Sequence, residues 1–323
     1  MRAAVPDAIF AHPRLAQVYD AFDGPRDDLP AYVGIADELG ARRVLDAGCG
    51  TGTLAILLAG TGRDVIGADP AAASLDVARS KDGASAVTWV HAGAAGVPRA
   101  RADLAVMTGN VAQVFLADAD WAQALRAVGA AVRPRGHLVF ETRRPERRAW
   151  EEWAAETGAV TREVPGAGQV EQRFEVTAVN LPLVSFRYTY TFRGDGAVIT
   201  SDSTLRFRGR EELESSLAAE GFRVLDVRQA PDRPGHEFVF VTQRRPRRCA
   251  ICDWVSPSAW HSISTSRCAG DSESRASRTI RLSRIWSAPS ASDGTCVSST
   301  ASSGREDGRR CRSVAMLRAI TNM

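Results

Sequence analysis

Apolar positions in the first half of the chain follow two alternating periods. Segments in which apolar residues recur three and four positions apart are followed by short, continuous apolar runs of strand length. The helical segments are 13–22, 29–39, 54–59, 72–79 and 121–132, and the strand-like runs are 43–47, 64–68, 87–91, 103–107 and 137–142. Five buried strands that alternate with helices predict an α/β fold with a parallel, doubly wound sheet and right-handed crossovers.

The pattern changes after a Trp-bearing helical segment near 146–157. Three longer runs at 169–180, 183–193 and 197–208 are rich in Val, Thr, Phe and Tyr, and turn sequences separate them. They predict an antiparallel β-hairpin insertion at about 159–208. A helix at 211–220 and two strands at 222–227 and 237–242 follow, which brings the expected main sheet to seven strands.

Periodicity ends beyond Arg244. We therefore predict an N-terminal helical cap at 1–40, an α/β domain at 41–243 and a disordered tail at 244–323. The tail is rich in Ser and Arg, unlike the Ala/Val/Leu-rich body, and its composition suggests a segment read from another frame of the same GC-rich DNA. Sequencing the transcript across codons 240–250 tests that hypothesis.

Charge is unevenly divided between these parts. The formal net charge is +3, but residues 1–243 carry 27 Lys+Arg against 32 Asp+Glu, whereas 244–323 carry 14 against 6. Five of the six cysteines lie in the tail, so the body has no disulfide framework. No apolar run approaches the roughly 20 residues of a membrane helix. These features predict a cytoplasmic protein, and the isolated tail sequence Cys249-x-x-Cys252 is not expected to bind zinc.

A glycine-rich turn follows the first strand. Gly48, Gly50 and Gly52 lie between the strand at 43–47 and the next helix, which favours close approach of a nucleotide-like cofactor, the alternative being a tight turn without a ligand. A dinucleotide fingerprint requires glycine where Thr53 stands, and a Walker loop requires a following lysine, whereas the only lysine is Lys81.

The residue before these glycines narrows the choice of ligand further. Asp46 stands two positions before Gly48. A carboxylate there repels a pyrophosphate and suits a ligand that carries an ammonium and a sulfonium.

The run from Val44 to Gly52, Val-Leu-Asp-Ala-Gly-Cys-Gly-Thr-Gly, resembles the first motif of class I S-adenosylmethionine-dependent methyltransferases. The resemblance covers roughly 12–243. It implies a Rossmann-like, mostly parallel seven-stranded sheet, S-adenosyl-L-methionine as the cofactor, and methyl transfer to an O, N or C nucleophile of a small molecule. It also assigns cofactor binding to Tyr19, Asp46, Gly48, Cys49, Gly50, Gly52, Asp69, Pro70, Gly93, Ala94 and Asn110.

Two acidic positions carry much of that implied cofactor site. By resemblance, Asp46 organises the loop and the methionine ammonium, and Asp69, 17 residues after Gly52, binds both ribose hydroxyls. The family usually has an Asp near the adenine amine, but Gly93 stands there in this chain. Backbone groups at 93–95 are expected to replace that side chain, and cofactor binding is expected to be weaker.

The methyl-acceptor site is expected at the carboxyl ends of the fourth and fifth strands. Asn110 is a candidate for orienting cofactor or substrate, with a turn residue as the alternative. Glu141 is a weak candidate for a base, with an ion pair to Arg143 or Arg144 as the alternative. No catalytic residue is assigned. Tyr19 on the first helix is expected to face the sulfonium or to pack, and Trp150 and Trp153 are expected to form a packing pair.

Other functions remain open from the sequence. A nucleic-acid substrate is not expected, because Thr108-Gly109-Asn110-Val111 replaces the loop that holds a flipped base in base-modifying relatives and because the body is acidic. The alternatives are a protein that binds S-adenosylmethionine without catalysis and a nicotinamide oxidoreductase. The oligomeric state and the acceptor are not determined by the sequence.

Overall fold

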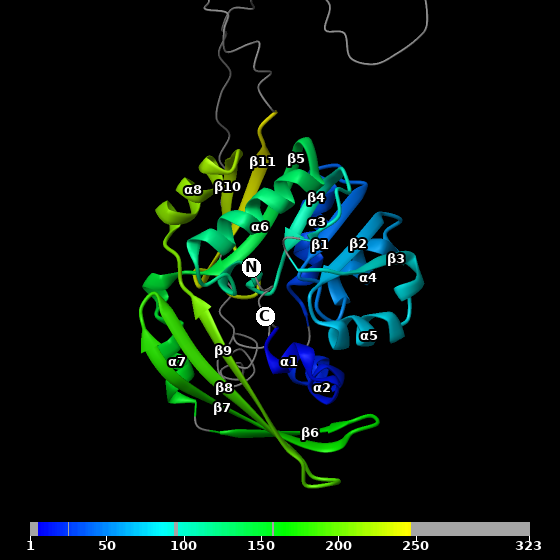
Figure 1. Ribbon diagram of the computed structural model, residues 1–323, viewed down its shortest axis with the longest axis vertical. Coiled ribbons are helices and arrows are strands. Elements are labelled where there is room, and N and C mark those ends of the chain that lie inside the picture. The colour runs from blue at the N-terminus through cyan, green and yellow to red at the C-terminus, as the bar shows by residue number, and fades with distance from the viewer. Residues whose placement is uncertain (1–5, 25, 94–95, 157, 247–323) are drawn as a thin grey trace, which may run out of the picture. The chain divides into compact units, whose positions relative to one another are not determined.

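The strand-like apolar runs form a seven-stranded sheet in the computed structural model, which describes residues 6–24, 26–93, 96–156 and 158–246 (Figure 1). Every described residue lies in one compact unit, the one that contains 1–247. The strand order is β10-β11-β5-β4-β1-β2-β3, and β11 is antiparallel to both of its neighbours. The strands are β1 (Arg43–Ala47), β2 (Asp64–Asp69), β3 (Val87–His91), β4 (Ala102–Met107), β5 (Val132–Arg143), β10 (Phe222–Gln229) and β11 (Glu237–Arg244).

Helices cover both faces of this sheet. On one face, α6 (Asp118–Ala131) and α8 (Arg210–Ala219) bury Trp121 and Leu217 against strand residues such as Leu45. On the other face, α3 (Leu29–Glu38) and α4 (Thr53–Gly60) pack against residues such as Val44. Successive residues of β1 therefore enter opposite cores, which explains why the parallel strands read as continuous apolar runs. The helix α5 (Ala72–Ser80) follows β2. The predicted fold class is confirmed.

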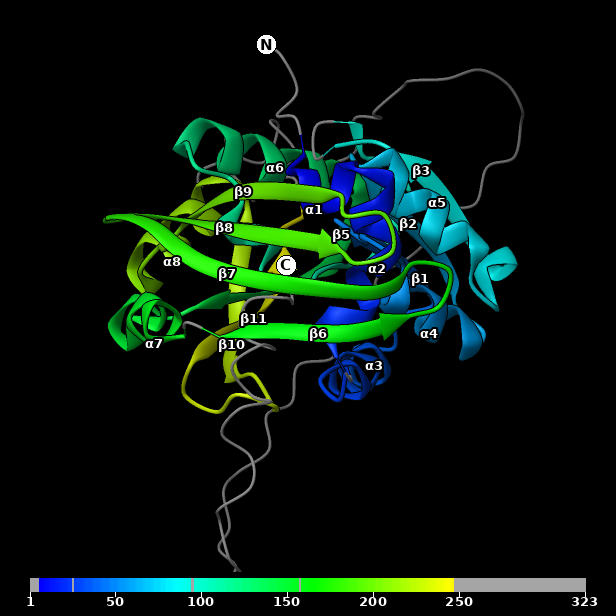
Figure 2. The ribbon, with the colours of Figure 1, turned by 90° about the horizontal axis from the view of Figure 1, so that it is seen from below.

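A second, antiparallel sheet is inserted after β5. Its strands β6 (Ala159–Val164), β7 (Gly168–Asn180), β8 (Leu183–Phe192) and β9 (Val198–Arg206) pair in chain order. Alternate residues of β8 are buried, and its inner face packs against α1 (Ala8–Ala11), α2 (Pro13–Asp23) and α7 (Ala149–Ala155). Figure 2 shows the four strands side by side, with α1 and α2 behind them. The inserted sheet, α1, α2 and α7 thus form a hydrophobic core that is separate from the two cores of the main sheet.

Several predicted boundaries differ from the structure. The strand β6 and the short helix α1 were not predicted, and the Trp-bearing helix is limited to 149–155. The prediction that β5 begins at His137 is wrong: pairing with β4 resumes after a bulge at 133–136, in which Arg135 has a φ of 64°. Gly136 is required there, because an added Cβ would lie 2.9 Å from the Asp103 carbonyl oxygen.

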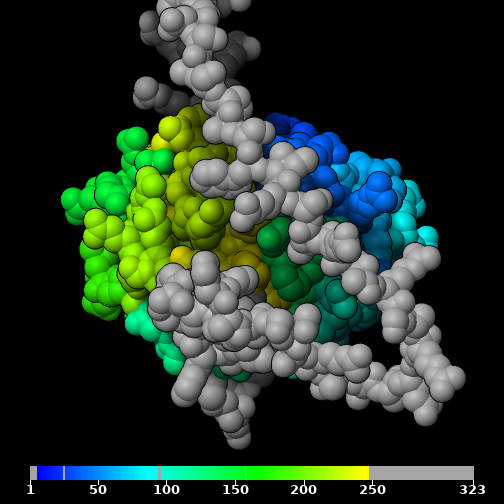
Figure 3. All heavy atoms as spheres, turned by 90° about the horizontal axis from the view of Figure 1, so that it is seen from above, coloured from blue at the N-terminus to red at the C-terminus, as the bar shows by residue number. Residues whose placement is uncertain are grey.

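The N-terminal segment divides between the two sheets. The helices α1 and α2 lie against the inserted sheet, whereas α3 packs on the main sheet. In the space-filling view, the green atoms lie on the left, and the blue and cyan atoms of the N-terminal part of the chain lie on the right of the face shown (Figure 3). The boundaries proposed for the cap and the α/β domain stay predictions, and the tail from 247 onward lies outside the described residues.

Candidate functional site

The glycine loop turns back against the second strand. The amides of Gly48 and Cys49 both donate to the Ala68 carbonyl, at 2.8 and 3.2 Å. Gly48, Gly50 and Gly52 all have positive φ, at 82°, 52° and 80°, which explains the residue type at each. Gly52 is the N-cap of α4, so the loop delivers the chain directly into a helix.

Asp46 lies beneath this loop at the end of β1 and is almost fully buried. Its Oδ1 has no hydrogen-bond partner. Burial, with a further contribution from the charge of Asp69, raises the pKa of Asp46 to about 7. A buried carboxyl with an unpaired oxygen is costly unless a ligand supplies a donor or a positive charge. This environment fits the ammonium expected from the sequence.

Asp69, at the end of β2, holds the loop from the other side. Its Oδ2 accepts from the Gly50 amide and its Oδ1 from the Ala71 amide, both at 2.8 Å. Burial raises its pKa, and these two hydrogen bonds oppose the rise. Each carboxylate oxygen has two lone pairs, so both oxygens keep the capacity to accept a hydroxyl.

The third strand ends beside Pro70. His91 Nε2 lies 2.9 Å from the Pro70 carbonyl oxygen. A Cβ added to Gly93 would have Pro70 Cβ as its nearest neighbour, at 3.8 Å, so a side chain fits there. Ala94, the other predicted cofactor residue of this stretch, lies outside the described residues. The departure from the family pattern at Gly93 is therefore not forced by packing.

The helix α2 contacts the glycine loop through polar side chains. Asp20 accepts a 2.6 Å hydrogen bond from Thr51 Oγ1, and its other oxygen pairs with Lys81 Nζ at 2.6 Å. Lys81 also donates to Thr53 Oγ1 at 3.0 Å. We call Asp20, Thr51, Thr53 and Lys81 the polar latch. Its neighbour Tyr19 is buried against Phe10, with ring centroids 5.5 Å apart.

We expect Lys81→Met to weaken cofactor binding about 5-fold, because a half-exposed ion pair contributes about 1 kcal/mol or less. The substitution keeps the apolar stem and removes the charge that joins α2 to the loop. Isothermal titration with S-adenosylhomocysteine measures the change. The control is Arg79→Met, which removes an exposed cation from the last turn of α5, two residues before Lys81. Equal affinities of the two variants would contradict a role for the latch.

Asn110 and Glu141 lie near the carboxyl ends of β4 and β5, as expected, and each has partners that the sequence does not indicate. Asn110, in the left-handed region with a φ of 61°, donates through Nδ2 to Glu237 Oε1 at 3.1 Å. Glu141 accepts from the Gly109 amide and the Tyr32 hydroxyl. The expected ion pair of Glu141 with Arg143 or Arg144 is therefore wrong, because the side chain points to other partners.

Burial and the charge of Glu237 raise the pKa of Glu141 to about 7. Arg143 lies across the β5–β11 pair from Glu237, with Nε 3.8 Å from Oε1, and burial lowers its pKa to about 10. Glu237 belongs to a strand that the sequence places 94 residues after Arg143, so no local pattern signals this pair.

The structure adds Asp23 to the candidate residues of the functional site. It is buried at the end of α2, four residues after Tyr19. The expected helical segment ends at residue 22, and the sequence alone does not single out Asp23 as a site residue. The signal was present, because Asp23 continues the apolar face of Tyr19 at helical spacing, where an acidic residue is unusual.

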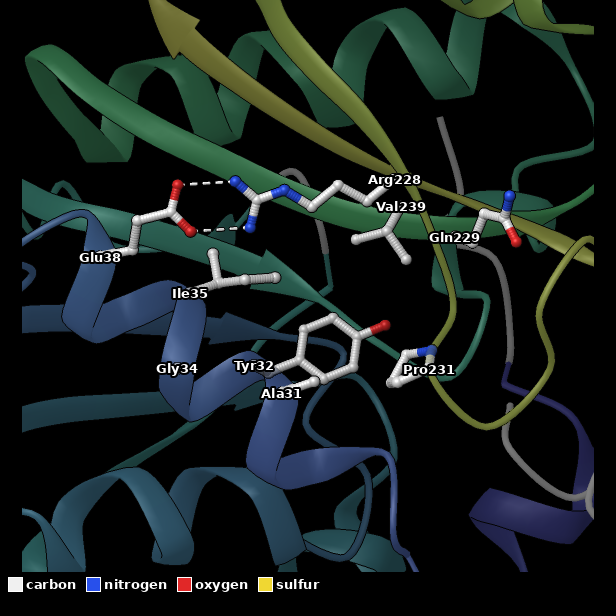
Figure 4. A pocket seen from close by; sticks show the side chains of 9 residues that line it. All are labelled: Ala31, Tyr32, Gly34, Ile35, Glu38, Arg228, Gln229, Pro231 and Val239. Carbon is white, nitrogen blue, oxygen red and sulfur yellow. Dashed lines mark hydrogen bonds and ion pairs between the residues drawn. The ribbon is translucent and has the colours of Figure 1, made fainter. Parts of the chain in front are cut away.

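The tryptophans pack as predicted. Trp150 and Trp153 are both buried, and each contacts the Phe207 ring, with centroids 4.9 and 5.9 Å apart. A surface hollow lies elsewhere, between α3 and β10, where Glu38 and Arg228 form a bidentate ion pair (Figure 4). No predicted cofactor residue lines that hollow, although Tyr32, the partner of Glu141, is among its lining residues.

The part of the chain that the structure describes contains neither a metal-ligand cluster nor a membrane-spanning helix. Within it, no group of three or more His, Cys, Asp or Glu side chains is placed to hold a metal ion. The Cys249-x-x-Cys252 sequence lies outside it. No helix of the described ranges is long and apolar enough to cross a membrane.

Comparisons with known proteins agree with this geometry. A family model described as a methyltransferase domain matches residues 15–175. No curated protein matches the sequence. The sugar N-methyltransferase KedS8 from Streptoalloteichus sp ATCC 53650 is similar in structure, with a TM-score of 0.62 and 19% identity over 76% of this chain and 98% of that one.

Two other solved structures are similar at lower scores. An S-adenosylmethionine-dependent methyltransferase from Clostridium acetobutylicum ATCC 824 has a TM-score of 0.59 and 15% identity, covering 72% of this chain and 98% of its own. The amino pentose methyltransferase CalS10 from Micromonospora echinaspora has a TM-score of 0.55 and 21% identity, covering 71% and 97%. At these identities the likeness establishes the fold.

Proposed function

We propose that this chain, which belongs to the methyltransferase domain family, transfers the methyl group of S-adenosyl-L-methionine to an O, N or C nucleophile of a small molecule. The enzyme is an S-adenosylmethionine-dependent methyltransferase, and the acceptor class is the part that we propose. The observation that carries the cofactor site is the joint placement of Asp46 and Asp69 around the glycine loop, with an unpaired, buried oxygen on Asp46.

The cofactor supplies a methyl group on a positively charged sulfur. Asp46 would hold the ammonium, Asp69 the ribose hydroxyls and Tyr19 the sulfonium side, while Cys49, Pro70, Gly93 and Asn110 remain predicted contacts. Methyl transfer is an in-line displacement, so these residues mainly align the reactants and exclude water. The polar latch helps them by holding α2 on the loop.

A small acceptor is supported by the cover over the carboxyl ends of the strands. The inserted sheet packs against α1 and α2 through a shared apolar core, and α2 in turn contacts the glycine loop. The body carries more acidic than basic residues, which disfavours a polyanionic substrate. Sugar and amino pentose methyltransferases are among the proteins with similar structures.

Thermal unfolding with added ligands tests this proposal. A ligand present at 100 times its Kd stabilises a protein by about 2.7 kcal/mol. For a domain of this size we expect S-adenosylmethionine or S-adenosylhomocysteine to raise the Tm by about 5 °C or more. NAD at the same concentration should have no effect. Protection by NAD alone would refute the cofactor assignment.

A further inference from the structure

Besides Asp46, several buried side chains of the described residues keep a polar atom without a hydrogen-bond partner, and four of these atoms lie between the end of α2 and the carboxyl ends of β4 and β5. They are Asp23 Oδ1, Asn110 Oδ1, Arg143 Nη2 and Glu237 Oε2. All four side chains are at least nine-tenths buried. Three of these atoms are hydrogen-bond acceptors and one is a donor. Leaving such atoms unpaired costs about 1–3 kcal/mol each, so they are expected to meet polar groups of a ligand.

Asn110, Arg143 and Glu237 lie together at the carboxyl ends of β4 and β5, and Asp23 lies at the end of α2, where its neighbour Phe22 packs against Tyr190 of the inserted sheet. Asn110 Nδ2 lies 3.1 Å from Glu237 Oε1, and Arg143 Nε lies 3.8 Å from the same oxygen. Tyr188, on the inner face of β8, interacts electrostatically with both Arg143 and Asp23. The region therefore runs from the end of α2, past the inserted sheet, to the carboxyl ends of β4 and β5.

Asp23 is only weakly held by its own partner. The Arg26 guanidinium makes two 2.9 Å hydrogen bonds to Asp28, but its single hydrogen bond to Asp23 is 3.3 Å long. Asp23 lies one helical turn after Asp20, which binds the glycine loop through Thr51. Asp23 is therefore only three residues away from a side chain that contacts the glycine loop, closer along the chain than Glu237 is.

Resting on the proposed function, we infer that the methyl acceptor is a primary amine whose two N–H groups are accepted by Asp23 and by Asn110 or Glu237. A ligand rich in donors matches three unpaired acceptors better than a hydroxyl, which has a single O–H. The nitrogen lone pair forms the bond to the methyl carbon, and the electrons of the broken C–S bond stay on sulfur. The methylated nitrogen then loses its proton to the carboxylate of Asp23.

The ionisation of Asp23 suits this role. Burial raises its pKa to about 7, against the opposing charge of Arg26. The charges of Asp20 and Asp28 add to the rise, and Tyr19, Tyr188 and Tyr190 interact electrostatically with Asp23. A base with a pKa near the working pH accepts a proton and releases it again to water.

Sinefungin tests the inference without knowledge of the acceptor, because it carries a primary amine in place of the sulfonium methyl. S-adenosylhomocysteine lacks that group and serves as the reference ligand in isothermal titration. We expect sinefungin to bind the wild-type chain about 10-fold more tightly than S-adenosylhomocysteine. In Asp23→Asn the ratio should fall to about 2-fold or less, whereas Asp76→Asn, an exposed carboxyl on α5, should preserve it.

A pH series on the wild-type chain gives a second measurement that needs no variant. The ratio should increase between pH 6 and pH 8, as Asp23 loses its proton and the ligand amine stays charged. A ratio near one at both pH values, with S-adenosylhomocysteine bound, would overturn the amine assignment and leave the methyltransferase assignment intact. Failure of both ligands to bind would overturn both.

Discussion

Asp69→Asn is expected to weaken S-adenosylmethionine binding by about 100-fold or more. The carboxylate accepts hydrogen bonds from the Gly50 and Ala71 amides and keeps lone pairs that can accept two ribose hydroxyls. Hydrogen bonds to a charged acceptor contribute about 1.5–3 kcal/mol each, and loss of two corresponds to at least a 100-fold change. An asparagine also turns one NH₂ donor toward a backbone amide or a hydroxyl. Isothermal titration measures the loss.

Asp64→Asn is the matched control, since Asp64 begins the same strand but is exposed and pairs only with Arg43. Its affinity should remain within about 2-fold of the wild type. The 2′-deoxy analogue of S-adenosylhomocysteine then separates two roles of Asp69. If Asp69 binds the ribose, the substitution costs less with the deoxy ligand, as expected of coupled groups. An equal cost with both ligands would assign Asp69 to loop support alone.

The glycine loop, which stays the predicted cofactor site, could be located from the sequence because its determinants are local. The βα turn, the three glycines and the positions of Asp46 and Asp69 lie within 24 consecutive residues, and strand β1 has the predicted bounds. Positive φ at all three glycines follows from the same short pattern. Local geometry therefore fixes this half of the candidate site.

The other half depends on contacts between distant segments. Glu141 was expected to pair with a neighbouring arginine, but Tyr32, 109 residues away, provides its partner. Glu237 meets Asn110 and Arg143 only because β11 inserts beside β5 in antiparallel register. A sequence pattern reports which faces are buried, and it does not report which polar groups meet inside them.

The polar latch illustrates the same limit. Resemblance places Tyr19 on a helix near the cofactor, but the contacts of its neighbour Asp20 with Thr51 and Lys81 come from the structure. The close packing around Gly52 also cannot be read from the local sequence, because it involves Ala78 and Trp89, which are distant along the chain.

Gly52→Ala is expected to destabilise the fold by about 2–4 kcal/mol and to lower the Tm by about 5–12 °C. Its φ of 80° disfavours any residue with a Cβ by about 1–2 kcal/mol. The added Cβ would also lie 2.4 Å from Trp89 Cη2 and 2.9 Å from Ala78 Cβ, and overpacking of a core costs about 1–3 kcal/mol.

Trp89 cannot easily move away from the Cβ added at Gly52, because its Nε1 donates a 3.0 Å hydrogen bond to the Ala84 carbonyl. Gly50→Ala separates the two contributions in the same loop: Gly50 also has positive φ, but nothing lies within 4 Å of its added Cβ. It should cost only about 1 kcal/mol, the backbone penalty alone. Urea unfolding of both variants gives the difference. If the two alanines prove equally destabilising, the contact of Gly52 with Trp89 does not limit the residue at this position, and backbone conformation alone explains the glycine.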